Sequence, residues 1–209
     1  MILLLTGAIS GSACTRSKGV TSVYCIGDSL TYGWPEPCTT YPQALQTSLD
    51  SSPPHGAWTV VNEGIGGNTT AQMLARFGTD VVDQEPDVVI IWGGINDVLF
   101  HGTPVSSIEA NLQAMHTQAH NAGITVVALY ISPFKGYPLR TAGQQATVDS
   151  VNAWIGAKAK DVDYRVNIYT PLEDPSRPDC LLAAYDADGT HLTTAGYAVV
   201  AGEAYDAVQ

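Results

Sequence analysis

Residues 23–30 read Val-Tyr-Cys-Ile-Gly-Asp-Ser-Leu, an apolar run that ends at Gly27 and is followed at once by Asp28 and Ser29. A short run of this composition predicts a buried strand, and the turn-forming residues after it put Ser29 at the strand's carboxyl end. Four further runs rich in β-branched residues lie at residues 58–62, 87–92, 124–130 and 165–169. The sequence therefore predicts five buried strands, the first of which carries a serine at its end.

Helix-like stretches separate these strands and follow the last one. They occupy residues 41–49, 69–77, 105–122, 141–160 and 194–208, and Thr194 is the candidate N-cap of the last. Alternating strands and helices predict a parallel sheet that is covered by helices on both faces. The expected fold class is α/β, a three-layer α/β/α architecture with a flavodoxin-like, doubly wound sheet of five parallel strands. Sites in such sheets form at the carboxyl ends of the strands.

The composition limits the partners. The 209 residues carry 9 Lys and Arg against 20 Asp and Glu, which gives a formal net charge of -11, and there is no basic run. No nucleic-acid partner is therefore expected, and neutral small-molecule substrates are favoured over polyanions. No segment has the apolar length of a stable membrane span. The length predicts one domain over residues 21–209 after a leader-like or flexible N-terminus over residues 1–20. The sequence gives no basis for predicting the number of subunits.

The N-terminal region resembles the end of a secretory leader. Residues 1–13 are uncharged and mostly apolar or small, and Gly11-Ser12-Ala13-Cys14 is similar to a lipoprotein cleavage box. We therefore expect a secreted or periplasmic protein, with Cys14 as the candidate lipid-anchor site. Because the apolar stretch is very short and no Lys or Arg precedes it, a cytoplasmic location stays open.

A second motif supplies the groups that a serine nucleophile needs. Asp188-Gly189-Thr190-His191 follows the fifth predicted strand, so it falls at the same edge of the sheet as Ser29. A serine hydroxyl needs a base, for which His191 is the candidate, and Asp188 can orient that base from three residues away. Segments after the second and third strands add oxyanion donors, namely the backbone N–H of Gly67 and the side-chain amide of Asn96, beside the N–H of Ser29.

Four segments together resemble the SGNH/GDSL hydrolase family. They are Gly27-Asp28-Ser29-Leu30, Gly67 within Gly66-Gly67-Asn68-Thr69, Gly94-Ile95-Asn96-Asp97, and Asp188-Gly189-Thr190-His191, in family order. The resemblance implies esterase, lipase or thioesterase activity on a flavodoxin-like fold, with no metal and no organic cofactor. It implies a triad of Ser29, Asp188 and His191, and an oxyanion hole formed by Ser29, Gly67 and Asn96. Gly66-Gly67-Asn68 departs from the Ser-Gly-Asp run of many relatives, which leaves the geometry of that loop open.

These features predict a serine ester hydrolase that cleaves carboxylic esters through an acyl-enzyme, with short acyl chains favoured because no long lid insertion is present. Lysophospholipase, acyl thioesterase and carbohydrate O-acetylesterase activities on the same site are the alternatives. A non-enzymatic binder that keeps the fold is disfavoured, because no block of the motif is broken. The candidate substrate-pocket residues are the loop side chains Tyr32, Trp34, Leu99, Phe100, Phe134 and Tyr137.

Other residues that often mark sites receive structural interpretations. Cys38 and Cys180 fall in loops near the reactive edge, so they form either a disulfide or two free thiols. His116 and His120, four apart on a helix, are expected on a solvated face and not at a metal site, because no third ligand is evident. The remaining expectations are an exposed His55, His101 near the substrate cleft, and loop-bracing roles for Asp28 and Asp97.

Overall fold

The computed structural model describes residues 19–51, 57–141 and 143–209, so the predictions for Cys14 and His55 lie outside the described residues. Five strands form one sheet: β1 (Val20–Gly27), β2 (Ala57–Gly64), β3 (Val88–Trp92), β4 (Thr125–Leu129) and β5 (Tyr164–Val166). Their order is β2-β1-β3-β4-β5, and every neighbouring pair is parallel. This is the flavodoxin-like order, which confirms the predicted fold class.

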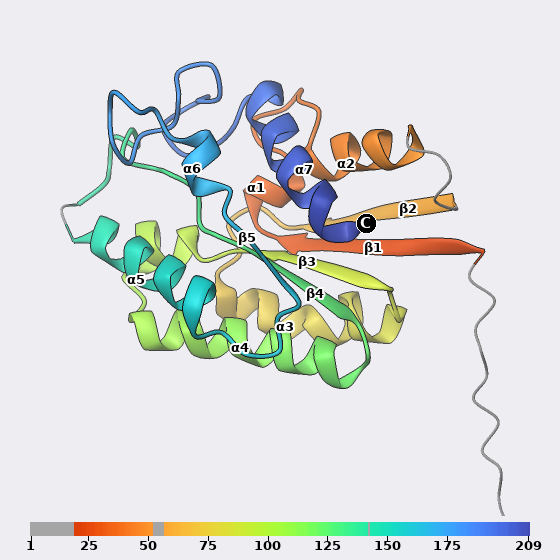
Figure 1. The fold of residues 1–209 in the computed structure, drawn as a ribbon. Coiled ribbons are helices and arrows are strands. Elements are labelled where there is room, and N and C mark those ends of the chain that lie inside the picture. The colour runs from red at the N-terminus through yellow and green to blue at the C-terminus, as the bar shows by residue number, and fades with distance from the viewer. Residues whose placement is uncertain (1–18, 52–56, 142) are drawn as a thin grey trace, which may run out of the picture.

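Helices cover both faces of the sheet (Figure 1). On one face lie α1 (Ser29–Tyr32), α2 (Tyr41–Asp50), α6 (Tyr169–Leu172) and α7 (Thr194–Val208). On the other lie α3 (Thr70–Asp80), α4 (Val105–Asn121) and α5 (Gln144–Ala157). Two short turns, η1 (Val82–Gln84) and the π-helical η2 (Asp97–His101), follow α3 and β3. Because both faces are covered, all five residues of the central strand β3 are buried.

Local signals in the sequence explain where the helices begin. Capping boxes of Thr40 with Gln43 and of Thr69 with Gln72 start α2 and α3. The N-cap of α7 is Thr193, whose hydroxyl accepts the N–H of Gly196, so the prediction of Thr194 is wrong by one residue.

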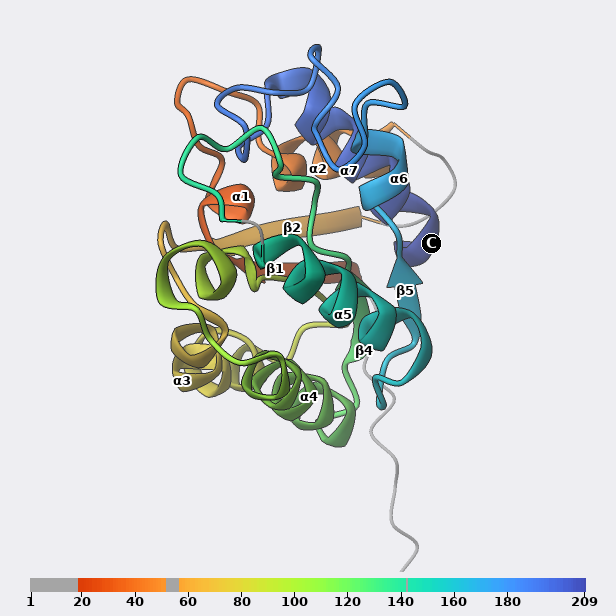
Figure 2. The same ribbon diagram turned by 90° about the vertical axis from the view of Figure 1, so that its left-hand side faces the viewer.

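The chain arrangement brings distant segments to one edge of the sheet. The strand β1 lies between β2 and β3. The chain therefore passes from β1 to β2 on one side of β1 and then crosses over to β3 on its other side. Figure 2 looks onto the end of the sheet from which α1 leaves β1. A sheet of this kind opens a crevice at the carboxyl ends of the strands where the order reverses, which here is the region between β1 and β3.

Two predictions about individual side chains are corrected. His116 is buried at 1% exposure and stacks on Trp154, with ring centroids 6.0 Å apart, so it does not lie on a solvated face. His120 is exposed, as expected. Of the two interpretations of Cys38 and Cys180, the structure has the free thiols.

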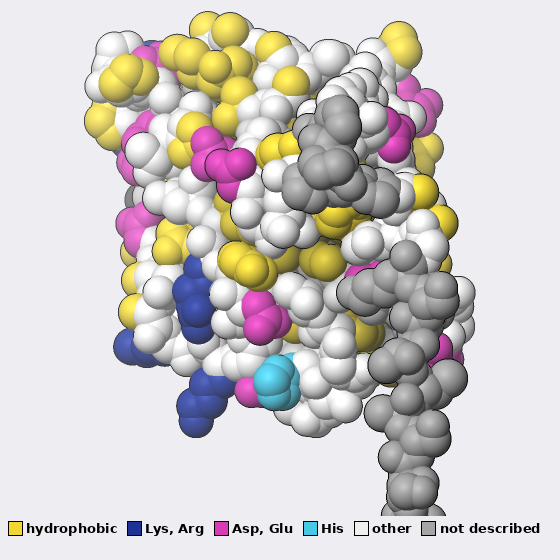
Figure 3. Space-filling model, turned by 45° about the vertical axis from the view of Figure 1, so that its right-hand side comes forward, with side chains coloured by type: hydrophobic (Ala, Val, Ile, Leu, Met, Phe, Trp, Pro, Cys, Tyr) yellow, Lys and Arg dark blue, Asp and Glu magenta, His cyan; other side chains and the backbone are white. Residues whose placement is uncertain are grey.

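The molecular surface carries the acidic excess of the composition. On the face drawn in Figure 3, acidic side chains are spread widely, whereas basic side chains gather at one lower corner. Within the described ranges, no helix combines the length and the apolar character that crossing a membrane requires.

Candidate active site

Ser29 lies where β1 ends and the one-turn helix α1 begins. The chain is so closely packed here that a Cβ on Gly27 would overlap the side chain of Thr31 and the carbonyl of Trp92. Asp28 caps α1, because its Oδ1 accepts the N–H of Leu30 at 2.9 Å. Asp28 is fully buried, whereas Ser29 is half-buried. The turn thus hides a carboxylate and presents a hydroxyl.

His191 reaches Ser29 from the other end of the sequence. Its Nε2 lies 2.8 Å from the Oγ of Ser29, and its Nδ1 lies 2.7 Å from the Oδ2 of Asp188. Partial burial raises the pKa of Asp188, but hydrogen bonds from the backbone and ring of His191 and from Thr190 outweigh that effect, and the pKa is lowered. An ionised Asp188 holds a proton on Nδ1, which leaves Nε2 to accept the serine proton.

The turn that carries both groups is closed on itself. Oδ1 of Asp188 accepts the backbone N–H of His191 at 2.8 Å and that of Thr190 at 3.1 Å. Between them, Gly189 has a φ of +93° and packs against the backbone of Gly136, so a side chain would not fit there. The carboxylate and the imidazole therefore belong to one small rigid unit.

The loop over residues 64–68, which begins at the last residue of β2 and leads toward α3, brings Gly67 to the same edge. The loop starts with a hydrogen bond of 3.1 Å from the N–H of Ile65 to the carbonyl of Gly27, and closes with one of 3.2 Å from Asn68 to Ile65. Gly67 has a φ of +79°, and an added Cβ would meet nothing within 4 Å. Within the described part of the chain, the N–H groups of Ser29 and Gly67 donate no hydrogen bond, so both remain available to a ligand.

Asn96 follows β3 and connects the neighbouring strand ends. Its Nδ2 donates to the Oδ2 of Asp28 at 3.2 Å and to the carbonyl of Asn68 at 3.0 Å. Burial raises the pKa of Asp28 to about 7, the N–H of Leu30 opposes the rise, and the nearby Asp97 adds to it. Asp28 contacts Asn96 and not the ring of His191, in keeping with the bracing role expected for it.

Asp97 holds the segment around Asn96 through a second set of hydrogen bonds. Its carboxylate accepts the backbone N–H of Thr70 at 2.7 Å and the hydroxyl of Thr70 at 2.8 Å. Because Asp97 begins η2 and Thr70 begins α3, these bonds tie the two elements together next to Asn96, which precedes Asp97 in the chain. The structure thus gives Asp97 the loop-holding role that was expected.

A single cavity of about 430 Å³ joins these groups. It is lined by Ser29, Tyr32, Trp34, Gly66, Gly67, Asn96, Phe100 and His191. The exposed rings of Tyr32, Trp34 and Phe100 form its apolar wall. The cavity therefore gathers a serine hydroxyl, an imidazole and several N–H donors around one space that is lined mostly by apolar surface.

Three of the predicted pocket residues do not line this cavity. Phe134 is fully buried in the core, and Leu99 packs against the core from η2. Tyr137 is not among the lining residues but contacts the ring of Phe100 edge to face, with ring centroids 6.0 Å apart. His101 is exposed at the end of η2 and also does not line the cavity, whereas Gly66, which was not predicted, does.

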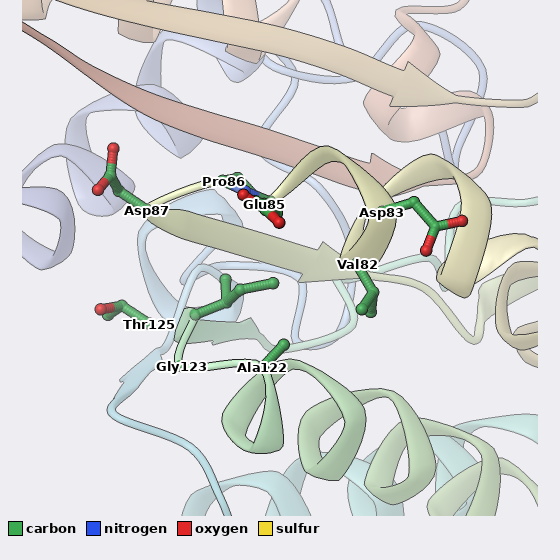
Figure 4. Close-up of a pocket in the computed structure, with 9 residues that line it drawn as sticks. Val82, Asp83, Glu85, Pro86, Asp87, Ala122, Gly123 and Thr125 are labelled. Atoms are coloured by element: carbon green, nitrogen blue, oxygen red, sulfur yellow. The ribbon is translucent and has the colours of Figure 1, made fainter. Parts of the chain in front are cut away.

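A second cavity of about 690 Å³ lies at the amino ends of β3 and β4 (Figure 4). Its lining includes the acidic residues Asp83, Glu85 and Asp87, together with residues at the end of α4 such as Gly123. None of its lining residues is a serine, cysteine or histidine, so it holds no pairing of a serine or cysteine with a histidine of the kind found at Ser29. In the ranges that the structure describes, no cluster of three or more His, Cys, Asp or Glu side chains is arranged to hold a metal ion.

Comparisons with known proteins agree with this geometry. A profile of the GDSL-like Lipase/Acylhydrolase family matches residues 25–199. The chain is 33% identical over 133 residues to an arylesterase of Vibrio mimicus, a match that covers 63% of this chain and 64% of the relative. It is 35% identical over 107 residues to an uncharacterized lipoprotein of Bacillus subtilis, covering 50% of this chain and 42% of that protein. Both matches span less than two thirds of the relatives' lengths.

Solved structures share the fold. One is the crystal structure of a GDSL-like lipase from Bacteroides thetaiotaomicron, which is 26% identical to this chain, with a TM-score of 0.72. The superposition covers 90% of this chain and 87% of that structure. The similarity thus extends over nearly all the elements that position Ser29 and His191.

Proposed function

Because the chain belongs to the GDSL-like lipase/acylhydrolase family, we propose that it hydrolyses carboxylic esters through an acyl-enzyme on Ser29. The observation that carries the proposal is the continuous line from the Oγ of Ser29 through the imidazole of His191 to Asp188, with separations of 2.8 and 2.7 Å. Heavy atoms this close can exchange a proton directly. A base that is itself oriented by a carboxylate is what a serine hydroxyl requires at neutral pH.

In the proposed mechanism the Oγ of Ser29 attacks the ester carbonyl carbon while its proton passes to Nε2 of His191. The carbonyl oxygen becomes an oxyanion, which accepts hydrogen bonds from the N–H groups of Ser29 and Gly67 and from the amide of Asn96. The tetrahedral intermediate then expels the alcohol, which takes the proton from His191. Water attacks the acyl-enzyme with the same base, releasing the carboxylic acid and restoring the hydroxyl. Asp188 stays ionised and stabilises the imidazolium.

The cavity favours small neutral esters. Its lining holds no charged side chain apart from His191 when protonated, and the rings of Tyr32, Trp34 and Phe100 offer apolar contact. A volume of about 430 Å³ suits a short acyl group together with part of the alcohol. The name of the Vibrio mimicus relative, an arylesterase, supports an aromatic alcohol portion. A series of acyl lengths, with an acetylated sugar and an acyl thioester beside it, separates this proposal from the alternatives.

The central test is hydrolysis of p-nitrophenyl acetate by wild type and by Ser29→Ala. We expect kcat to fall by about 10⁴-fold or more, as when a serine nucleophile is removed from a comparable enzyme. The matched control is Ser150→Ala, which removes an exposed serine of α5 whose hydroxyl donates to the carbonyl of Ala146. That variant should keep wild-type activity. Full activity in Ser29→Ala would overturn the proposal, as would a failure of wild type to hydrolyse any ester of the series.

A further inference from the structure

Arg76 lies on α3, outside the cavity, and makes an unusual set of hydrogen bonds. Its Nη2 donates to the carbonyl of Gly27 at 2.9 Å and to that of Glu63 at 2.8 Å. Its Nε donates to the Oδ1 of Asn68 at 2.9 Å, and its Nη1 to Asp80 at 2.8 Å. Four of the five guanidinium N–H groups are thereby used, and three of the four acceptors are not charged. The side chain is only 15% exposed.

The three uncharged acceptors lie around the two ends of the loop over residues 64–68, whereas Asp80 is on α3. Glu63 precedes the loop, Asn68 closes it, and Gly27 is the last residue of the adjacent strand β1, two residues before Ser29. The middle of the loop has little packing of its own, because a Cβ added at Gly66 or Gly67 would meet nothing within 4 Å. The position of the loop thus depends on how its ends are held, and Arg76 holds both.

The hydrogen bond from Arg76 to Asn68 also links Arg76 to the segment that carries Asn96. The carbonyl of Asn68 accepts the amide of Asn96 at 3.0 Å, while the side chain of Asn68 accepts from Arg76. One residue outside the cavity therefore connects the ends of β1 and β2 directly and the end of β3 through Asn68. A planar guanidinium with fixed N–H directions can make such a set of bonds, whereas a lysine ammonium cannot reproduce it.

We propose that Arg76 is a positioning residue that fixes the Gly67 N–H relative to Ser29 by holding both ends of the loop over residues 64–68. The proposal rests on the ester hydrolase function proposed above. A displaced oxyanion donor weakens binding of the transition state more than binding of the substrate. Loss of the guanidinium should therefore lower kcat and leave KM nearly unchanged.

The test compares Arg76→Lys with Asp80→Asn, both assayed on p-nitrophenyl acetate beside wild type and Ser29→Ala. Arg76→Lys keeps the positive charge but loses most of the bonds, and we expect kcat to fall about 10- to 100-fold with KM within about threefold, the size expected when one donor is misplaced. Asp80→Asn removes only the charged partner of Arg76 and should keep wild-type kcat. An equal loss of kcat in both variants would mean that the ion pair matters and would overturn the proposal.

A second measurement keeps the proposal testable if Arg76→Lys folds poorly. Asn68→Ala removes only the side-chain acceptor, keeps the carbonyl that Asn96 uses, and should lower kcat severalfold. In a folded Arg76→Ala variant, guanidinium chloride at low millimolar concentration should restore part of kcat, whereas ammonium chloride should not. If wild type is active and Ser29→Ala is inactive, but neither the Arg76 variants nor Asn68→Ala changes kcat, the positioning role is wrong while the proposed function stands.

Discussion

Asn96 shows at the scale of one residue how the site can respond to charge. Both hydrogens of its amide are already engaged, by Asp28 at 3.2 Å and by Asn68 at 3.0 Å. To bind an oxyanion, the amide has to share or exchange one of these hydrogen bonds. The bond to Asp28 is the longer of the two, so it is the one more readily replaced. Asp28 is thus both the brace of the amide and the acceptor that an oxyanion would replace.

Replacing Asn96 by Ala tests that role. We expect kcat for p-nitrophenyl acetate to fall about 10²- to 10³-fold, the usual effect of removing one oxyanion donor. Asn121→Ala, at the exposed end of α4, is the matched control and should behave as wild type. Steady-state kinetics over a full substrate range gives kcat and KM separately. A loss of less than a few-fold in Asn96→Ala would make Asn96 a structural residue only.

The sequence is informative about residues whose chemistry restricts their identity. Ser29 and His191 can be paired from strand alternation alone, because it puts both at one sheet edge, and the two side chains are indeed in contact. Loop side chains carry no comparable restriction. Phe134 and Phe100 were both predicted as aromatic loop residues, yet Phe134 is fully buried and Phe100 is 57% exposed. Arg76 gave no signal, since two of its four acceptors are backbone carbonyls, which any sequence contains.

At the scale of elements, the packing of α4 on α5 contains a buried histidine. His116 stacks on Trp154 of α5, and its Nδ1 has no hydrogen-bond partner within the described part of the chain. Burial and the charge of Arg165 lower the pKa of His116 to about 4, with a smaller opposing effect of Asp161. The imidazole is therefore packed as a neutral ring, and the contact is sensitive to acid.

The sign of this sensitivity follows from the two pKa values. The unfolded chain binds a proton at His116 near pH 6.5, whereas the folded chain does so only near pH 4. Between these values the unfolded state holds more protons, so the free energy of unfolding falls as the pH is lowered through that window, by about 3 kcal/mol in total. His116→Phe keeps a flat ring beside Trp154 and removes the titration.

Denaturant unfolding at pH 7.5 and pH 4.5 measures the effect. Wild type should lose about 2 to 3 kcal/mol more between these two pH values than His116→Phe does. The exposed His120, on the same helix, gives the control variant His120→Gln, which should follow wild type. Equal losses in wild type and in His116→Phe would show that His116 does not govern the acid sensitivity.

Helices and strands were predictable where burial imposes a period. His116 follows Leu112 by four residues and precedes Ala119 by three, so it shares the buried stripe of α4, and that spacing was the missed signal. The fifth strand, predicted over residues 165–169, is instead Tyr164–Val166, because Tyr169 begins α6. Arg165 is exposed on that edge strand and turns back to donate to the carbonyls of Ile155 and Ala159. Such tertiary contacts leave no periodic pattern.

At the scale of the whole molecule, the strand order and the charge act together on substrate choice. The reversal between β1 and β3 opens the crevice in which Ser29, Asn96 and His191 meet. The chain around that crevice carries a net charge of -11, and no Lys or Arg lines it. The field of the protein therefore opposes the approach of an anionic ester.

Two esters that differ by one negative charge and one methyl group test this property. The p-nitrophenyl monoester of succinic acid should be hydrolysed with a kcat/KM about 3- to 10-fold below that of its neutral methyl ester at low salt, because like charges slow the encounter. The gap should narrow at about 0.5 M salt, where screening extends over only a few ångströms. Equal rates at low salt, or a gap that salt does not change, would show that the charge of the protein does not select the substrate.

The overall architecture followed from the sequence because alternating strand and helix patterns leave few ways to build a sheet. The order β2-β1-β3-β4-β5 is one of them, and it sets the edge at which the motifs meet. The pocket walls did not follow, since the path of η2 depends on tertiary contacts such as the one between Asp97 and Thr70. The loop that carries Trp34 is likewise held by a hydrogen bond from the hydroxyl of Tyr197 to the carbonyl of Trp34.

The closed turn over Asp188 and His191 has a consequence for how the contact between His191 and Ser29 can be lost. Asp188 and His191 are brought together locally, within four residues, and the backbone of Gly136 packs against the turn. Ser29, by contrast, meets His191 through one contact between positions 162 residues apart. The turn is thus a locally preformed unit that contacts the end of β1. Heat or strain that loosens the C-terminal segment would therefore separate this turn from β1 as one unit. The ring of His191 would keep its hydrogen bond to Asp188 after losing its contact with Ser29.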